Sequence, residues 1–532
     1  MVIAAAEQSG ELASGRVAWR GAIAAKHALD RQYDTGLGSR VASVIRDPFY
    51  AISSVESTEI RKRGGGVEAC QLSHILRTMG KAISTWTSVG HVRAAQFGAY
   101  CLDGSTPGYW YQPPMPLPRT SQLWLIFLDG GAWCYDAHSC ESRAKGFKGT
   151  GEKSIPQSNF WPYAGHMDAD PKVNPIFSGF HRLHFHYCDG SSYSGDREAP
   201  LPSEGKKLLY LRGRRVLAAQ LDTALQAGLR DAEEVLFSGG SAGGIGAMHA
   251  AKALRAALPH VRRFKVLIVS GFFLERRTGM QQQSSDPNAE LQSPNAASSS
   301  VATGTGHPTC RRGRGADEKC IPWVHKMRRM CEMHNCTNAL LDGGCGRSLH
   351  AHEAWRCLFG KRAAAAVRLP TFFINSALDS WQMVNVWRRF AHCRWEDSKC
   401  TAPQADADVA ETNLMLRAFI RDMRASGALL RRGNGAFIYS CNEHVAGLSN
   451  AAFYGYMVNG WSMRQALHAW WNDDDDAPAT RHTHLPCELL RRRQGVGKRK
   501  DTNASRLRHA CDASCDRFRM KRRLSQECAC EP

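Results

Sequence analysis

Short apolar runs alternate with helical patterns through the middle of the chain. Residues 123–128 and 235–237 have the continuous apolar character of buried strands, and residues 208–230 carry Leu and Val at helical spacing. Further strands are predicted at residues 100–109 (entering a turn), 183–187, 266–269, 370–375 and 435–439. This alternation predicts an α/β fold of the α/β-hydrolase type, with a mostly parallel central sheet and helices on both faces.

The flanks of this pattern differ in character. Residues 1–95 combine scattered basic residues with a Gly-rich run, and we expect a poorly defined N-terminal extension. The α/β catalytic domain is expected over residues 96–487. Within it, residues 275–319 are polar and low in complexity, which predicts a disordered surface insertion. Residues 488–532 form a basic tail that contains cysteines.

A G-x-S-x-G sequence, residues 239–243, separates the strand at 235–237 from a helical pattern. A serine at such a turn is tolerated only where its neighbours lack bulk, and the turn exposes its hydroxyl. The helix start directs unpaired N–H groups at the same place, where an oxyanion would form. We therefore predict that Ser241 is a nucleophile. The alternatives are a plain Gly/Ser loop and a phosphate loop, and the second is disfavoured because no Gly-Lys-Ser/Thr follows.

Later strands end in residues that suit the other roles of a hydrolase. Asp379 follows the strand at 370–375, and His444 follows the strand at 435–439. Nucleophile, acid and histidine in that order are typical of α/β-hydrolases. His444 is preferred because it follows a late strand after the acid, although three other histidines lie near candidate strands or the nucleophile helix: His184, His186 and His249.

Small residues also follow the strand at 123–128, in the sequence Asp129-Gly-Gly-Ala-Trp-Cys134. Small side chains let backbone N–H groups approach a ligand closely, as the second half of an oxyanion hole requires. The alternative is a plain tight turn.

Cysteine and charge content restrict the environment and the partners. The 19 cysteines lack paired C-x2-C spacings, which favours disulfides in an oxidising compartment over zinc sites. Sequons at Asn335 and Asn503 are compatible with secretion, but the first residues show no signal peptide. No apolar run approaches the ~20 residues that span a bilayer, so no transmembrane segment is expected.

The net charge of +20 suits polyanions such as nucleic acid, anionic lipid or acidic polysaccharide.

A series of motifs resembles the pectin acetylesterase family, which comprises plant-type carbohydrate esterases and Notum-like protein deacylases. The motifs occur in family order, at residues 101–107, 129–134, 187–196, 211–214, 239–244, 270–274, 377–382, 440–444 and 511–515. Two departures stand out. Plant members usually have Gly where this chain has Ala132, and Cys-Gln where it has Val445 and Ala446.

The resemblance implies a catalytic triad of Ser241, Asp379 and His444. It also implies an oxyanion hole from the backbone N–H groups of Gly131, Ala132 and Ala242, and no metal or organic cofactor. The implied disulfides are Cys101 with Cys188 and Cys134 with Cys140.

The resulting expectation is a secreted or cell-wall serine esterase, a monomer, that removes acetyl groups from a polysaccharide such as pectin through an acyl-enzyme. The basic surface would suit an anionic polymer. One alternative is Notum-like removal of a fatty acyl (palmitoleoyl) group from a protein, which needs a deep apolar pocket beside Ser241. Another is a non-catalytic polyanion-binding protein, suggested by the basic tail. No nucleic-acid partner is expected, because no recognisable binding motif accompanies that tail.

Overall fold

The computed structural model describes residues 84–114, 121–151, 164–203, 205, 207–276, 322–345, 349–387, 402–473 and 483–484. The predicted tail at 488–532, nearly all of the predicted insertion at 275–319 and most of the N-terminal extension lie outside these residues. Among the described residues, no helix has both the length and the apolar character needed to cross a membrane.

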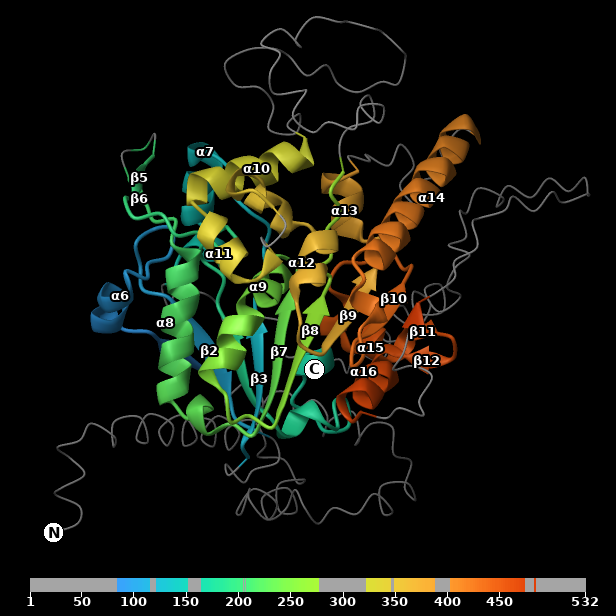
Figure 1. Cartoon of the computed structure of the whole chain (residues 1–532), viewed down its shortest axis with the longest axis horizontal. Coiled ribbons are helices and arrows are strands. Elements are labelled where there is room, and N and C mark those ends of the chain that lie inside the picture. Colours follow the sequence, from blue (N-terminus) through green and yellow to red (C-terminus); the bar gives the residue numbers. More distant parts are fainter. Residues whose placement is uncertain are drawn as a thin grey trace, which may run out of the picture.

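A nine-stranded sheet forms the centre of the fold, in the order β1-β2-β4-β3-β7-β8-β9-β10-β13 (Figure 1). Pairing is parallel from β4 through β13 and antiparallel on both sides of β2. The strands are β1 (Thr85–Ser88), β2 (Gly108–Gln112), β3 (Leu123–Leu128), β4 (His181–Phe185), β7 (Glu234–Gly240), β8 (Arg263–Val269), β9 (Thr371–Ser376), β10 (Gly435–Tyr439) and β13 (Thr483–His484).

Helices cover both faces of this sheet, as the sequence predicts (Figure 1). Side chains of a strand point alternately to opposite faces. In β3, Ile126 and Leu128 accordingly join one buried cluster, whereas Leu125 and Phe127 join another. The first cluster includes α8 (Gly213–Gln226), α9 (Ala242–Ala257), α10 (Trp323–His334), α12 (Gly360–Ala366) and α14 (Ala402–Ala425); the second includes α15 (Asn450–Gly455) and α16 (Met463–Trp471). The predicted fold class is therefore confirmed.

The N-terminal edge of the sheet differs from the sequence-based prediction in two ways. The prediction of a strand entering a turn at residues 100–109 has the wrong order: the turn comes first, closed by a hydrogen bond from the Cys101 N–H to the Ser105 carbonyl, and β2 begins at Gly108. In addition, β1 pairs with β2, and α6 (His91–Phe97) begins before the predicted domain start at residue 96. The sheet thus includes residues from the end of the predicted extension.

Disulfides connect segments on the described part of the fold. Cys101 pairs with Cys188 and Cys134 with Cys140, which are the two pairs that the family resemblance implies. Further disulfides join Cys331 to Cys336 and Cys345 to Cys357. All eight of these cysteines are buried, so the covalent links lie within the packed structure.

Candidate active site

Ser241 occupies the sharp turn between β7 and α9, at the carboxyl edge of the sheet. Its backbone has φ 55° and ψ −123°, a conformation that costs a non-glycine residue free energy and persists only where the surroundings enforce it. The Ser241 N–H donates to the carbonyl of Val269 at the end of β8, at 2.9 Å. The neighbouring strand thus helps to hold the turn.

The glycines around Ser241 are required by close backbone packing. A Cβ on Gly239 would lie 2.2 Å from the Gly243 carbonyl oxygen, and one on Gly243 would lie 2.1 Å from the Leu128 oxygen. A Cβ on Gly130 would lie 2.3 Å from the Gly240 oxygen and 2.9 Å from the Ser241 Cβ. The end of β3 is therefore in direct contact with the serine turn, and no side chain fits between them.

Three residues from separate strand ends form a hydrogen-bonded chain. His444 Nε2 lies 2.8 Å from Ser241 Oγ, and His444 Nδ1 lies 2.7 Å from Asp379 Oδ2. Asp379 is fully buried, and its other carboxylate oxygen accepts the N–H of Gln382 at the start of α13 (Ser380–Asn385). With the imidazole proton on Nδ1, facing the carboxylate, Nε2 is left to accept the serine proton.

The loop that carries His444 is held by the two preceding strands. The N–H of Val445 donates to Ser270 Oγ at 2.9 Å, and Ser270 directly follows β8. Ser376 Oγ, at the end of β9, donates to the Cys441 carbonyl at 2.6 Å. Ser270 and Val445 both have positive φ, so two strained residues support the position of the imidazole.

The other histidines considered from the sequence have different contacts. His249, in α9, lies 2.9 Å from the Cys357 carbonyl, and burial lowers its pKa to about 4. His186 lies 2.8 Å from the Thr150 carbonyl, and burial lowers its pKa to about 3. His184 lies 3.7 Å from the carboxylate of Asp129. These three side chains serve the packing around the sheet, whereas His444 contacts Ser241.

The segment after β3 has an unusual backbone conformation. Gly131 has φ 151° and Ala132 has φ 58°, both in the region that favours glycine. Ala132, which has a side chain, is thus strained at this position. Because Gly130 touches the serine turn and Ala242 begins α9, the predicted donors Gly131, Ala132 and Ala242 belong to two segments that are in contact.

An ion pair that the sequence analysis missed lies beneath this segment. Asp129 is buried and pairs with Lys148 of the short helix η1 (Phe147–Gly149). Burial alone would raise the pKa of Asp129, but the Lys148 ammonium and His184 outweigh it and hold that pKa below its usual range. The Lys148 stem also packs over Gly131, where a Cβ would lie 3.0 Å from it. The sequence feature that could have indicated this ion pair is an aspartate directly after an apolar strand.

Aromatic rings form one wall beside His444, and the sequence analysis did not identify it. The rings of Phe273 and Trp381 each have their centroid 6.3 Å from the imidazole. They pack edge to face with each other and with Trp133, and Trp381 and Trp133 pack edge to face on Trp323, at centroid distances of 5.1–5.5 Å. Phe273 and Trp323 are tilted toward each other at 6.1 Å. Three of these rings lie within family motifs, which was a usable signal.

Cys134, Cys140 and His334 form a cluster whose residue types could bind a metal. His334 Nε2 lies 3.6 and 3.7 Å from the two sulfurs. The sulfurs are joined to each other in a disulfide, however, and a metal needs free thiolates. This arrangement is therefore a buried contact between a disulfide and an imidazole.

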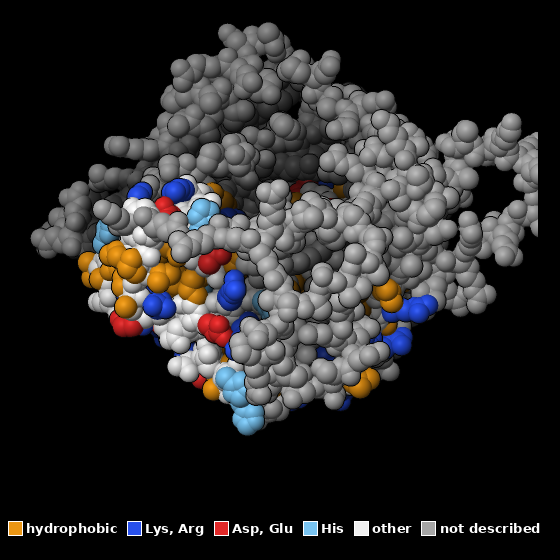
Figure 2. Space-filling model, turned by 90° about the horizontal axis from the view of Figure 1, so that it is seen from above, with side chains coloured by type: hydrophobic (Ala, Val, Ile, Leu, Met, Phe, Trp, Pro, Cys, Tyr) orange, Lys and Arg blue, Asp and Glu red, His pale blue; other side chains and the backbone are white. Residues whose placement is uncertain are grey.

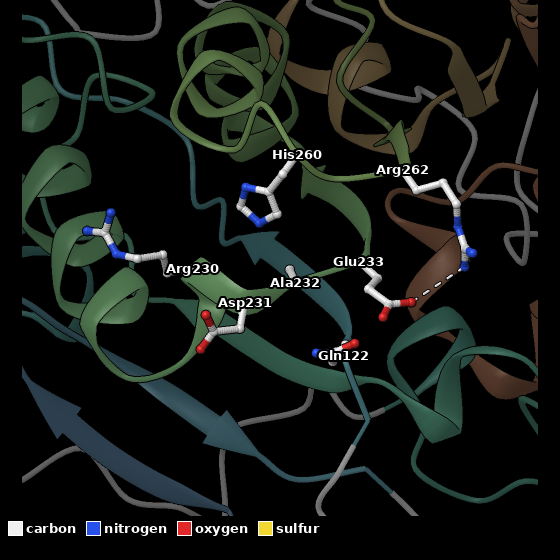
Figure 3. Close-up of a pocket in the computed structure, with 7 residues that line it drawn as sticks. All are labelled: Gln122, Arg230, Asp231, Ala232, Glu233, His260 and Arg262. Atoms are coloured by element: carbon white, nitrogen blue, oxygen red, sulfur yellow. Dashed lines mark ion pairs between the residues drawn. The ribbon is translucent and has the colours of Figure 1, made fainter.

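A separate pocket lies at the opposite edge of the sheet (Figure 3). Gln122, Glu233 and Arg262 line it and immediately precede β3, β7 and β8, so the pocket is at the amino ends of these strands. Glu233 and Arg262 form an ion pair at 3.6 Å across it (Figure 3). Because Ser241 follows the carboxyl end of β7, this pocket does not belong to the candidate site.

Comparison with known proteins adds independent information on this chain. A family model described as Pectinacetylesterase matches residues 84–489. Pectin acetylesterase 11 of Arabidopsis thaliana is 27% identical over 386 residues, covering 70% of this chain and 84% of that protein. Pectin acetylesterase 7 of the same plant is 26% identical over 367 residues, covering 67% and 79%. Palmitoleoyl-protein carboxylesterase NOTUM of Homo sapiens is 24% identical over 379 residues, covering 70% and 63%.

Replacing Gly130 by alanine is expected to reduce kcat/KM for ester hydrolysis by about 100-fold, as loss of an oxyanion donor does. The added Cβ would press on the Gly240 oxygen and separate the end of β3 from the serine turn. Ala132→Gly is the matched control and should keep its activity, because glycine adopts the positive φ at this position without strain. Full activity of Gly130→Ala would contradict the close packing.

Replacing Lys148 by methionine is expected to lower stability at pH 7 by about 2 kcal/mol, because Asp129 is left buried without its cation. The depressed pKa of Asp129 stabilises the wild type above pH ~4, and this contribution is lost as the pH falls. In the variant, burial raises that pKa, so protonation relieves the penalty. The difference in thermal unfolding midpoint should therefore shrink from pH 7 to pH 4, whereas the exposed control Lys252→Met should show little difference at either pH.

Proposed function

Because the chain belongs to the pectinacetylesterase family and is a carboxylic ester hydrolase, we propose that it removes acetyl groups from a polysaccharide such as pectin. The observation that carries this proposal is the hydrogen-bonded chain from Asp379 through His444 to Ser241, at 2.7 and 2.8 Å. Ser241 is assigned as the nucleophile, His444 as the base and Asp379 as the residue that orients His444.

Each step of the reaction has a group in position. His444 Nε2 takes the proton of Ser241 as Oγ attacks the ester carbonyl carbon, and a tetrahedral oxyanion forms. The protonated imidazole then gives its proton to the sugar oxygen, the C–O bond breaks, and the acetyl group remains on Ser241. Water, deprotonated by His444, attacks this acetyl-enzyme, and acetate leaves as Ser241 recovers its proton. Asp379 holds Nδ1 and stabilises the imidazolium.

The oxyanion is assigned to the backbone N–H groups of Gly131, Ala132 and Ala242. Contact between Gly130 and the serine turn brings the first two toward Ser241, and the start of α9 supplies the third. These donors need no metal or organic cofactor, and their fixed backbone positions require little reorganisation during the reaction.

The aromatic wall supports a small acyl group. Phe273 and Trp381 stand beside His444, and the rings of Trp133 and Trp323 pack against them. The indole N–H groups of Trp133 and Trp323 are held by Ser192 Oγ and the Leu274 carbonyl, at 2.7 and 3.1 Å. Rings packed and anchored in this way occupy the space that a long acyl chain would need, whereas an acetyl methyl can lie on their surface.

The apolar character of the same wall favours a second candidate function. Relatives described as palmitoleoyl-protein carboxylesterases match a similar share of this chain, and a fatty acyl group requires apolar surroundings. Removal of a fatty acyl group from a protein would require the rings to separate into a deeper pocket. The acyl-chain preference therefore distinguishes the two functions.

We also propose where the enzyme acts and what its basic charge binds. The buried disulfides support a secreted or cell-wall enzyme. The net charge of +20 would suit an anionic polysaccharide. On the described part of the face in Figure 2, basic and acidic side chains are interspersed.

Ser241→Ala is expected to reduce acetate release from acetylated pectin by more than about 1,000-fold, because the variant lacks the hydroxyl that is assigned to form the acyl-enzyme. Acetate is measured by an enzyme-coupled assay on the purified protein. Ser142→Ala, an exposed serine in α7 (Ala137–Ala144), serves as the control and should match the wild type. Undiminished release by Ser241→Ala would refute the triad.

The wild type is expected to hydrolyse the acetyl ester of nitrophenol at least about 10-fold faster than the octanoyl ester, in kcat/KM, because the packed rings exclude the longer chain. Trp381→Ala should shift this ratio toward octanoyl by removing one ring of the wall. Trp461→Ala, which changes a partly buried ring packed against the second buried cluster on the other face of the sheet, should leave the ratio unchanged. A strong octanoyl preference of the wild type would favour the fatty-acyl alternative.

A further inference from the structure

We propose that Arg143 is a positioning residue for the oxyanion hole: its guanidinium fixes the peptide whose N–H contacts the oxyanion. This inference rests on the proposed function, in which Ala132 supplies one of the donors. Arg143 lies at the end of α7 and does not touch Ser241 through any described hydrogen bond. Its role would be exerted through the backbone.

The geometry of a single peptide bond connects Arg143 to the site. Arg143 Nη1 donates to the Gly131 carbonyl oxygen at 2.8 Å. In a planar trans peptide, the carbonyl of residue 131 and the N–H of residue 132 point in opposite directions. By holding the Gly131 oxygen on one side, Arg143 therefore directs the Ala132 N–H to the other. The positive charge also polarises the peptide, which strengthens this N–H as a donor.

The following peptide is held in a similar way by a neutral group. The Tyr187 hydroxyl donates to the Ala132 carbonyl at 2.8 Å and accepts the N–H of Ser192 at 2.9 Å. Both carbonyls around the strained Ala132 are thus bound by side chains. Without these bonds, a residue with φ 58° would gain by relaxing to an ordinary conformation, and the donor would turn away.

Arg143 is itself fixed by its surroundings. The Cys134–Cys140 disulfide ties α7 to the chain two residues after Ala132. A capping box between Asp136 and Ser139 sets the start of the helix. The guanidinium lies over the ring of Tyr187, 5.0 Å from its centroid. These contacts connect the arginine rigidly to the segment that it holds.

The remaining donors of Arg143 form no hydrogen bond within the described ranges, although its positive charge also favours the ionised form of the buried Asp189 carboxylate. Its Nε and Nη2 are buried and have no hydrogen-bond partner within the described ranges. An arginine needed only for stability would normally use its donors in pairs with a carboxylate. Within the described ranges, the hydrogen bond that Arg143 donates goes to the Gly131 carbonyl oxygen.

Arg143→Gln is expected to lower kcat for nitrophenyl acetate by about 10- to 100-fold with little change in KM, since the misdirected N–H matters most in the transition state. Affinity for a trifluoromethyl ketone, which forms an oxyanion adduct with a reactive serine, should fall by the same factor. Arg143→Lys should restore part of both losses. Arg262→Gln, an exposed arginine at the opposite edge of the sheet, is the control and should behave as the wild type.

Unchanged kcat and ketone affinity in Arg143→Gln would overturn the inference. So would a loss of kcat that accompanies a lower thermal midpoint while ketone affinity stays at the wild-type value, because that pattern indicates a structural role alone. Failure of the proposed function gives a different result: Ser241→Ala would then retain hydrolysis of the same ester. The two failures are therefore separable in one set of variants.

Discussion

The site depends on direct backbone contact between the end of β3 and the turn that carries Ser241. Gly243 lies against the Leu128 carbonyl, and Gly130 lies against the Gly240 carbonyl and the Ser241 Cβ. Any side chain at these glycines would separate the two segments. The strained angles of Ser241 and Ala132 persist because the close packing of the two segments holds both backbones in place. The serine turn and the segment after β3 consequently form one packed unit.

Much of this arrangement could be predicted from the sequence because it follows from local patterns. Apolar runs located β3, β7, β8, β9 and β10 to within a few residues, since buried parallel strands have few polar positions. The carboxyl ends of parallel strands meet at one edge, so residues that follow β7, β9 and β10 were expected to converge. The structure places Ser241, Asp379 and His444 in hydrogen-bonding contact there; their catalytic roles remain a prediction.

What the sequence could not predict are contacts between side chains from unrelated segments. Lys148 meets Asp129 across 19 positions, and Arg143 meets Gly131 across 12. Neither separation matches the period of a helix or a strand, so no sequence pattern predicts either contact. The aromatic wall combines Trp133, Phe273, Trp323 and Trp381, and only the folded sheet edge brings them together. The order of turn and strand before β2 was also missed, because it depends on the turn that Cys101 and Ser105 close.

The long separation between Ser241 and His444, 203 positions, has a consequence for biosynthesis. When the serine turn leaves the ribosome, His444 and the strand that precedes it have not yet been synthesised. During that interval the nascent polypeptide contains a complete β7–α9 unit whose hydroxyl has no base beside it. Under the roles proposed for these residues, hydrolysis therefore requires that the segment carrying His444 has been synthesised and has packed beside the serine turn.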